Sequence, residues 1–184
     1  MKTVKVPYGR GVLSANVAES NLVGIFESAL PEAAPGQRAE VERALDNPVG
    51  SPHLEELARG RRSAVVITSD HTRPVPSKTI MPCILERLRK GSPDIQITIL
   101  VATGFHRATT REELIGKLGA EIVEHEHIVV HDSSDASMLT RLGTLPSGGE
   151  LIINRLAVET ELLVAERFIE PHFFAGFSGG RKAP

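Results

Sequence analysis

Three short polar segments hold the residues whose types are best suited to chemistry. Residues 69–74 read SDHTRP, residues 102–107 read ATGFHR and residues 170–172 read EPH, and each segment follows an apolar run. Histidine exchanges protons near neutral pH, so His106 and His172 are candidates for acid/base catalysis. A single loop histidine is more often a solvated or capping residue, but three such segments in one chain together indicate a site.

The first segment offers groups that bind or orient a charged ligand. Arg73 carries a planar guanidinium that is always charged, which suits a carboxylate or a phosphate. Asp70 can orient a histidine or a ligand hydroxyl, and it can equally cap a helix or pair with Arg73. In either role Asp70 would have a polar partner close to residues 69–74.

The last residues, 176–184, read GFSGGRKAP and are rich in glycine. Glycine tolerates positive φ, and successive N–H groups in such a turn form a concavity that suits an anion. Lys182 follows Arg181, and a neighbouring positive charge lowers the pKa of an amine and makes it a better nucleophile. The alternative is a solvated surface lysine. The segment is not a P-loop, because Arg precedes the lysine and no Ser or Thr follows it.

Two further patterns favour structural roles. His125, His127 and His131 have a spacing that could put three zinc ligands on one face of a strand, but a solvated edge strand is favoured because no cysteine or paired-ligand helix accompanies them. Cys83, the single cysteine, lies in an apolar helical pattern and is expected to be a small buried hydrophobe. No metal ligand is predicted within this chain.

Composition limits the class of protein and its partners. With 21 basic and 23 acidic residues the net charge is -2, and no basic run suggests a nucleic-acid partner. A single cysteine excludes an internal disulfide framework and fits a reducing compartment. No apolar run approaches the roughly 20 residues that span a bilayer, and the N-terminus lacks the apolar core of a signal peptide. We therefore expect a soluble, cytoplasmic protein that binds neither nucleic acid nor a membrane.

Apolar periodicity predicts the elements that position the polar segments. Residues 64–68 and 95–101 are typical of strands buried on both faces, and residues 77–90 between them have helical spacing. Other expected elements are strands over residues 128–131, 139–145, 150–154 and 161–168, helices over 37–45 and 54–58, a helix capped by Thr109 with Glu112 three residues on, and a β-hairpin from 4–7 and 11–17.

Alternating strands and helices predict an α/β fold, with a mostly parallel, Rossmann-like sheet flanked by helices and an N-terminal β-hairpin. Ligands bind beyond the carboxyl ends of parallel strands, so the three polar segments are expected to converge on one crevice. The chain stops where a glycine-rich turn would normally lead into a helix. We therefore expect these 184 residues to be the first part of a longer protein.

Together the three segments resemble the N-terminal domain of the nickel-dependent lactate racemase family. Members of that family carry close counterparts of residues 69–74, 103–107 and 170–172, followed by a counterpart of GFSGGRK at 176–182. The likeness extends from about Ser63 onward, and three motifs in the same order are more specific than one. The resemblance implies that residues 1–184 are the N-terminal, cofactor-binding domain of a longer two-domain enzyme, whose second domain is absent from this chain.

The resemblance also implies a cofactor and residue roles. The cofactor is a nickel pincer nucleotide, a pyridinium mononucleotide with thioamide and thiocarboxylate groups that hold nickel, and its covalent anchor would be Lys182. His106 and His172 would be the acid/base pair. The cofactor would lie near Asp70, His71, Thr72 and Arg73, while the family's nickel-ligating histidine falls beyond Pro184.

The implied activity is racemisation or epimerisation of a 2-hydroxy acid such as lactate. The Cα–H bond is too weakly acidic for a histidine to break, so hydride transfer to and from the tethered cofactor is implied, with one histidine per enantiomer moving the hydroxyl proton. The partners would be a small 2-hydroxy acid, the missing C-terminal part and the cofactor-synthesis enzymes, and this fragment alone would be inactive. The alternative is a non-catalytic module that binds an anion or a nucleotide.

Overall fold

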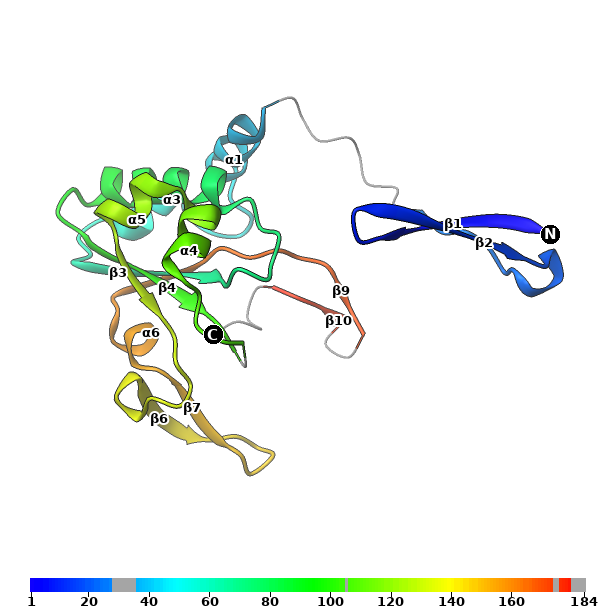
Figure 1. The fold of residues 1–184 in the computed structure, drawn as a ribbon. Helices are drawn as coiled ribbons and strands as arrows, with labels where there is room; N and C mark the ends of the chain where they lie inside the picture. Colours follow the sequence, from blue (N-terminus) through cyan, green and yellow to red (C-terminus); the bar gives the residue numbers. More distant parts are fainter. Residues whose placement is uncertain (28–35, 105, 174–175, 180–184) are drawn as a thin grey trace. The chain divides into compact units, whose positions relative to one another are not determined.

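The computed structural model describes residues 1–184 except 28–35, 105, 174–175 and 180–184 (Figure 1). The chain divides into two compact units, Met1–Ala33 and Ala34–Pro184. The first unit contains an antiparallel hairpin, β1 (Lys2–Tyr8) and β2 (Gly11–Val17), which is followed by the 3₁₀ turn η1 (Glu19–Asn21). The predicted N-terminal β-hairpin is thereby confirmed.

The second unit is built on a four-stranded parallel sheet. Its strands are β3 (Ser63–Ser69), β4 (Gln96–Ala102), β5 (His127–Val130) and β8 (Leu162–Ala165), in the order β5-β4-β3-β8. β3 pairs in parallel with both β4 and β8, and β4 pairs in parallel with β5. The predicted α/β fold with a mostly parallel sheet is confirmed.

Helices cover the two faces of this sheet unequally. Figure 1 shows α3 (Ser77–Gly91), α4 (Arg111–Leu118) and α5 (Ala120–His125) on one face, and the short α6 (Arg155–Glu159) on the other. The main core lies under the first three helices and is continued by α2 (Leu54–Ala58), while α1 (Gln37–Asp46), which has no buried residue, lies beside α3. Its fully buried members include Val66, Met81, Leu88, Ile99 and Val101, and Cys83 of α3 is fully buried as well. Cys83 is thus a buried residue, as predicted.

A second, smaller cluster lies on the α6 face, where Val65, Ile67 and Leu100 pack against Leu156 and Ala157. A separate antiparallel hairpin follows β5 and the 3₁₀ turn η2 (Ala136–Met138), and it consists of β6 (Leu139–Thr144) and β7 (Glu150–Asn154). The short strands β9 (Pro171–His172) and β10 (Gly176–Phe177) pair near the end of the described chain. No helix among the described residues is long and apolar enough to cross a membrane.

Some predicted boundaries were wrong. α4 is capped by Thr110, whose hydroxyl accepts from the Glu113 N–H while the Glu113 carboxylate accepts from the Thr110 N–H, so the capping box lies one residue later than predicted. Thr109 is instead buried and contacts His71. β8 ends at Ala165 rather than Phe168, because its pairing with β3 stops at Ala165, although the Glu166 N–H still donates to the Ile67 carbonyl.

Gly91 ends α3 against α2, and we expect this position to tolerate no side chain. A Cβ there would lie 2.8 Å from the Ala58 Cβ and would overlap the Glu55 carbonyl oxygen, so Gly91→Ala must push the two helices apart. We expect the free energy of unfolding to fall by about 1–3 kcal/mol, the usual cost of overpacking. Urea denaturation followed by circular dichroism measures this change.

Gly116→Ala is the matched control, because Gly116 lies within α4 and a Cβ there would meet nothing within 4 Å. Alanine has the higher helix propensity, so this variant should gain about 0.5–1 kcal/mol. Equal losses in the two variants would contradict the packing explanation.

Candidate active site

The buried carboxylate of Asp70 organises the loop that follows β3. Its side chain is only 2% exposed, and Oδ1 accepts hydrogen bonds from the Thr72 backbone N–H (3.1 Å) and hydroxyl (2.7 Å). Its Oδ2 lies 2.5 Å from Nδ1 of His106. Burial alone would raise the pKa of Asp70, but the hydrogen bonds from Thr72 and His106 outweigh burial and hold that pKa below its usual value.

The Asp70–His106 contact joins the first predicted segment to the second. Because Asp70 is ionised near neutral pH, it favours a proton on Nδ1 of His106 and so leaves Nε2 free to accept one. The His106 side chain is 44% exposed despite this contact. This histidine is therefore both oriented and accessible, which are the two requirements for a general base.

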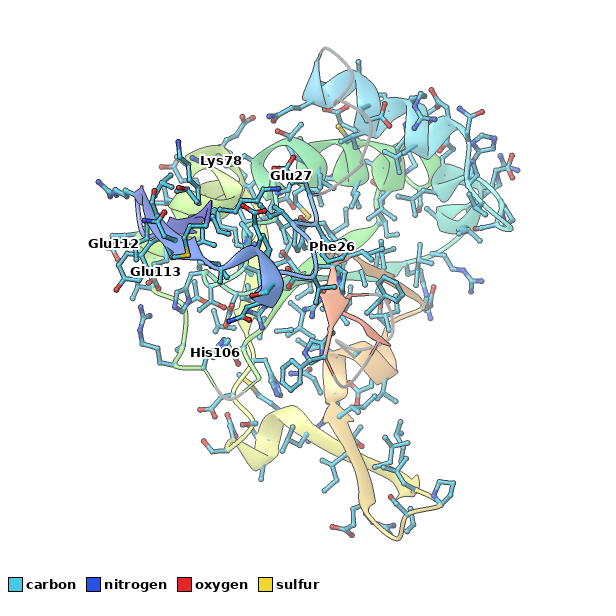
Figure 2. The ribbon with its side chains drawn as sticks, turned by 90° about the vertical axis from the view of Figure 1, so that its right-hand side faces the viewer. Phe26, Glu27, Lys78, His106, Glu112 and Glu113 are labelled. Atoms are coloured by element: carbon cyan, nitrogen blue, oxygen red, sulfur yellow. The ribbon has the colours of Figure 1, made fainter. Side chains whose placement is uncertain are left out.

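The other side of the loop is held by α4. His71 Nδ1 lies 3.2 Å from the Thr109 hydroxyl and 3.6 Å from Oε2 of Glu113, and the His71 side chain is only 17% exposed. Arg107 donates to both carboxylate oxygens of Glu113, at 2.8 and 2.5 Å. Figure 2 labels Glu113, which accepts in this ion pair, and His106, which precedes Arg107 in the sequence. His71 thus links the loop to the start of α4.

Glu166 lies directly after β8 and joins three elements under the loop. It is 4% exposed, and its carboxylate accepts from the Thr68 hydroxyl at the end of β3 (2.8 Å) and from the Ser77 hydroxyl at the start of α3 (2.7 Å). Its backbone N–H donates to the Ile67 carbonyl. Sequence reasoning missed Glu166, because the predicted strand ran through it to Phe168.

Two further cations near this edge were also missed. Lys117 of α4 donates to the Ser69 hydroxyl at 3.2 Å, and burial lowers the pKa of this lysine. Burial, and then the charge of Arg73, lower the pKa of Arg167. Lys117 stands at a helical position that periodicity alone assigns to a solvated face. The fold brings Lys117 close to Ser69, and this contact distinguishes it from a solvated surface lysine.

The third predicted segment approaches the same loop. His172 lines a small pocket, of about 30 Å³, together with Ser69, Arg73, Arg167 and Ser178. The His172 ring stacks on Phe173 with centroids 5.0 Å apart.

Ser178 fastens the turn that carries His172. Its hydroxyl accepts from the Glu170 N–H at 3.1 Å, and its own N–H donates to the Glu170 carbonyl. His106 and His172 therefore each meet the loop at 69–73, the first through Asp70 and the second through the pocket with Arg73. The predicted residue Lys182 lies outside the described residues.

The histidines considered as zinc ligands lie on different elements. His125 ends α5, so the strand spacing does not extend to it, while His127 begins β5 and His131 follows it. β5 is an edge strand of the sheet, and Nδ1 of His131 lies 3.0 Å from the Asn154 amide nitrogen. Within the described ranges, no group of three or more His, Cys, Asp or Glu side chains could hold a metal ion.

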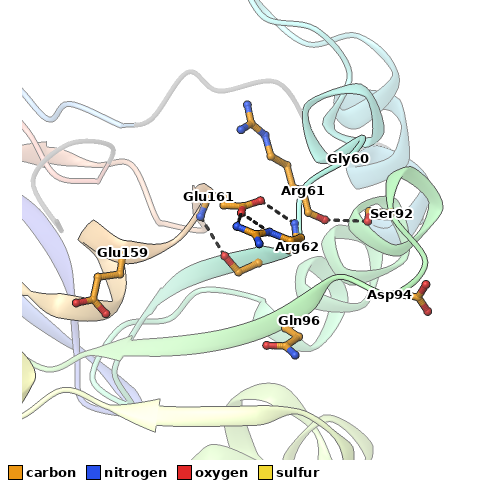
Figure 3. Close-up of a pocket in the computed structure, with 9 residues that line it drawn as sticks. Gly60, Arg61, Arg62, Ser92, Asp94, Gln96, Glu159 and Glu161 are labelled. Atoms are coloured by element: carbon orange, nitrogen blue, oxygen red, sulfur yellow. Dashed lines mark hydrogen bonds and ion pairs between the residues drawn. The ribbon is translucent and has the colours of Figure 1, made fainter.

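A larger hollow, of about 640 Å³, lies at the opposite edge, where the parallel strands begin (Figure 3). Arg62 is paired with Glu161 there, and Ser92 donates to the Arg61 carbonyl. None of the residues predicted from the sequence to form a site lines this hollow. His106 and His172, the two candidate acid/base residues, lie at the carboxyl edge instead, so this hollow is not the candidate site.

Comparisons with known proteins agree with the earlier resemblance. Residues 8–184 match the family described as lactate racemase N-terminal domain. The whole chain is 51% identical to the lactate racemase of Lactiplantibacillus plantarum and 49% identical to that of Thermoanaerobacterium thermosaccharolyticum. It covers 44% and 43% of those two proteins, respectively, so it spans less than half of their length.

Solved structures give the same answer for the fold. The lactate racemase apoprotein of Thermoanaerobacterium thermosaccharolyticum matches with a TM-score of 0.89 and 50% identity, over 98% of this chain and 42% of that one. A Thermotoga maritima protein at 23% identity matches with a TM-score of 0.65, over 82% of this chain and 38% of that one, and shows a shared fold alone. By sequence and by structure, this chain belongs to the lactate racemase N-terminal domain family.

Proposed function

We propose that this chain is the N-terminal, cofactor-binding domain of a two-domain, cytoplasmic enzyme that racemises or epimerises a 2-hydroxy acid such as lactate. Relatives at 51% and 49% identity are named lactate racemase, which supports this class of reaction. The observation that carries the proposal is the Asp70–His106 pair at the carboxyl edge of the sheet, beside Arg73 and His172.

The residues at this edge suit an anionic nucleotide. Arg73, Arg167 and Lys117 come from three different elements and supply positive charge, as a phosphate requires. We infer that a nickel pincer nucleotide is attached to Lys182 by the cofactor-synthesis enzymes and lies near the loop formed by Asp70, His71, Thr72 and Arg73. Bound there, it would supply the electron sink that accepts a hydride from Cα and returns it.

The protein's own groups would move a proton and hold the substrate. Nε2 of His106 would take the hydroxyl proton of one enantiomer as Cα is oxidised, and would return it to the oxygen in the reverse step. His172 would do the same for the other enantiomer. Arg73 would hold the substrate carboxylate or the cofactor phosphate, because a guanidinium matches two oxygens of either group at once. The partner that completes the site would be the C-terminal part of the same protein.

Lys182→Ala tests the covalent anchor in the full-length protein, made together with the cofactor-synthesis enzymes. We expect the cofactor adduct and the interconversion of lactate enantiomers to be lost together, since no other amine would hold the group. Intact-mass spectrometry measures the adduct, and chiral chromatography measures the activity.

Lys78→Ala is the control, because Lys78 is an exposed residue of α3. Full activity in Lys182→Ala would show that the proposed mechanism is wrong. A wild-type protein that never carries an adduct would favour a non-catalytic module that binds an anion or a nucleotide.

His106→Ala should produce a different kind of defect. We expect the adduct on Lys182 to remain, while kcat falls by roughly 10²–10⁴, as is typical for losing a general acid/base group. The exposed His125 provides the control, and His125→Ala should keep kcat within about twofold of the wild type. A normal kcat in His106→Ala would remove this histidine from the mechanism.

A further inference from the structure

Arg167 is a partly buried cation without a partner in the described part of the chain. It follows the buried Glu166, and it lines the small pocket with Ser69, Arg73 and His172. Its guanidinium forms no side-chain hydrogen bond or ion pair with any other described residue. A guanidinium has five N–H donors, and it accepts no hydrogen bond. Arg167 is thus suited to a ligand that brings acceptors.

The nearest carboxylates are already engaged by other groups. Asp70 accepts from Thr72 and contacts His106, and Glu166 accepts from the hydroxyls of Thr68 and Ser77. Glu170 also lines the pocket, but it forms no ion pair with either arginine there. None of these acids therefore neutralises Arg167 by direct contact.

Two arginines and a lysine lie close together at this edge. Arg73 lies close enough to lower the pKa of Arg167, after the larger effect of burial, and Lys117 is a third cation near the same residues. The carboxylates nearest to these cations are the buried Asp70 and Glu166, and Glu170 lines the pocket as well. Two like charges that share a pocket repel each other, and an anion that lies between them offsets this repulsion.

We propose that Arg167, together with Arg73, binds a small oxyanion at the carboxyl edge of the sheet. This inference rests on the proposed function and adds a binding residue to that site. The oxyanion is either the carboxylate of the 2-hydroxy acid or the phosphate of the nucleotide cofactor, since both present the same acceptors to a guanidinium. A pocket of about 30 Å³ suits one such group rather than a whole nucleotide.

The first test measures anion binding to the full-length protein made without the cofactor-synthesis enzymes. Isothermal titration with L-lactate and, separately, with inorganic phosphate compares the wild type with Arg167→Gln. We expect at least about a tenfold loss of affinity for one of these probes, because hydrogen bonds to a charged group are worth more than neutral ones. Loss for lactate identifies the substrate carboxylate as the ligand, and loss for phosphate identifies the cofactor phosphate.

Arg61→Gln is the matched control, because Arg61 is an exposed arginine at the opposite edge and lines only the hollow in Figure 3. Its affinity for both probes should equal that of the wild type. Unchanged affinity for both probes in Arg167→Gln, or equal losses in the two variants, would overturn the proposal.

A second measurement uses the wild type and does not depend on the folding of a variant. Phenylglyoxal modifies accessible guanidinium groups, and peptide mass spectrometry reports its reaction with each arginine. Lactate or phosphate should slow the modification of Arg167 and Arg73 severalfold and leave Arg61 unchanged. Equal rates at Arg167 with and without both anions would count against the proposal.

Kinetics of the cofactor-loaded enzyme separate this inference from the proposed reaction. If Arg167 holds the substrate carboxylate, Arg167→Gln should raise KM about tenfold or more with a normal adduct, and Arg167→Lys should restore part of the loss. If it holds the phosphate, the adduct on Lys182 should fall instead. A loaded wild type that never interconverts enantiomers would refute the racemase reaction, whereas the anion titrations would still decide the role of Arg167.

Discussion

The arrangement of the site depends on one buried carboxylate. Asp70 directly follows β3, one of the two central strands of the sheet, and stays ionised because Thr72 and His106 compensate for its burial. Without these hydrogen bonds the burial of the carboxylate would be unfavourable, and the loop would lose the contacts that hold it against Asp70. The same contact fixes the orientation of His106. The loop's conformation and the histidine's orientation thus have a single cause.

Glu166 gives that loop its foundation. By accepting hydrogen bonds from β3 and from the start of α3, its carboxylate fixes the distance between the strand that ends at the loop and the helix that follows it. A negative charge near the first turn of a helix is also favoured by the helix dipole. The two buried acids therefore have complementary tasks: one shapes the loop and the other secures the elements on which the loop rests.

Continuous apolar runs made the central strands predictable, since β3 and β4 are buried on both faces and consist mostly of apolar residues. The polar segments after them were predictable for the same reason, because strand ends in a parallel sheet lead to the ligand edge. Lys117, Glu166 and Arg167 were not predictable. The residues that they contact or approach lie far away in sequence. No local signal marks the end of β8, and the position of that end decides whether Glu166 belongs to the strand or to the site. The capping box was predicted one residue too early, because Thr109 and Thr110 are both suitable caps. In the structure Thr109 contacts His71 instead, and sequence alone does not reveal this contact.

The pairing of β8 with β3 has a consequence for the order in which the protein folds. β3, α3 and β4 are neighbours along the chain, whereas Thr68 and Glu166 are 98 residues apart. Contacts between distant residues require closure of a long loop and form later than local ones. We expect pulsed hydrogen exchange to show protection of β8 after that of β3 and β4. The edge that carries the chemistry is therefore assembled last, and during synthesis it cannot exist until nearly all of these residues have left the ribosome.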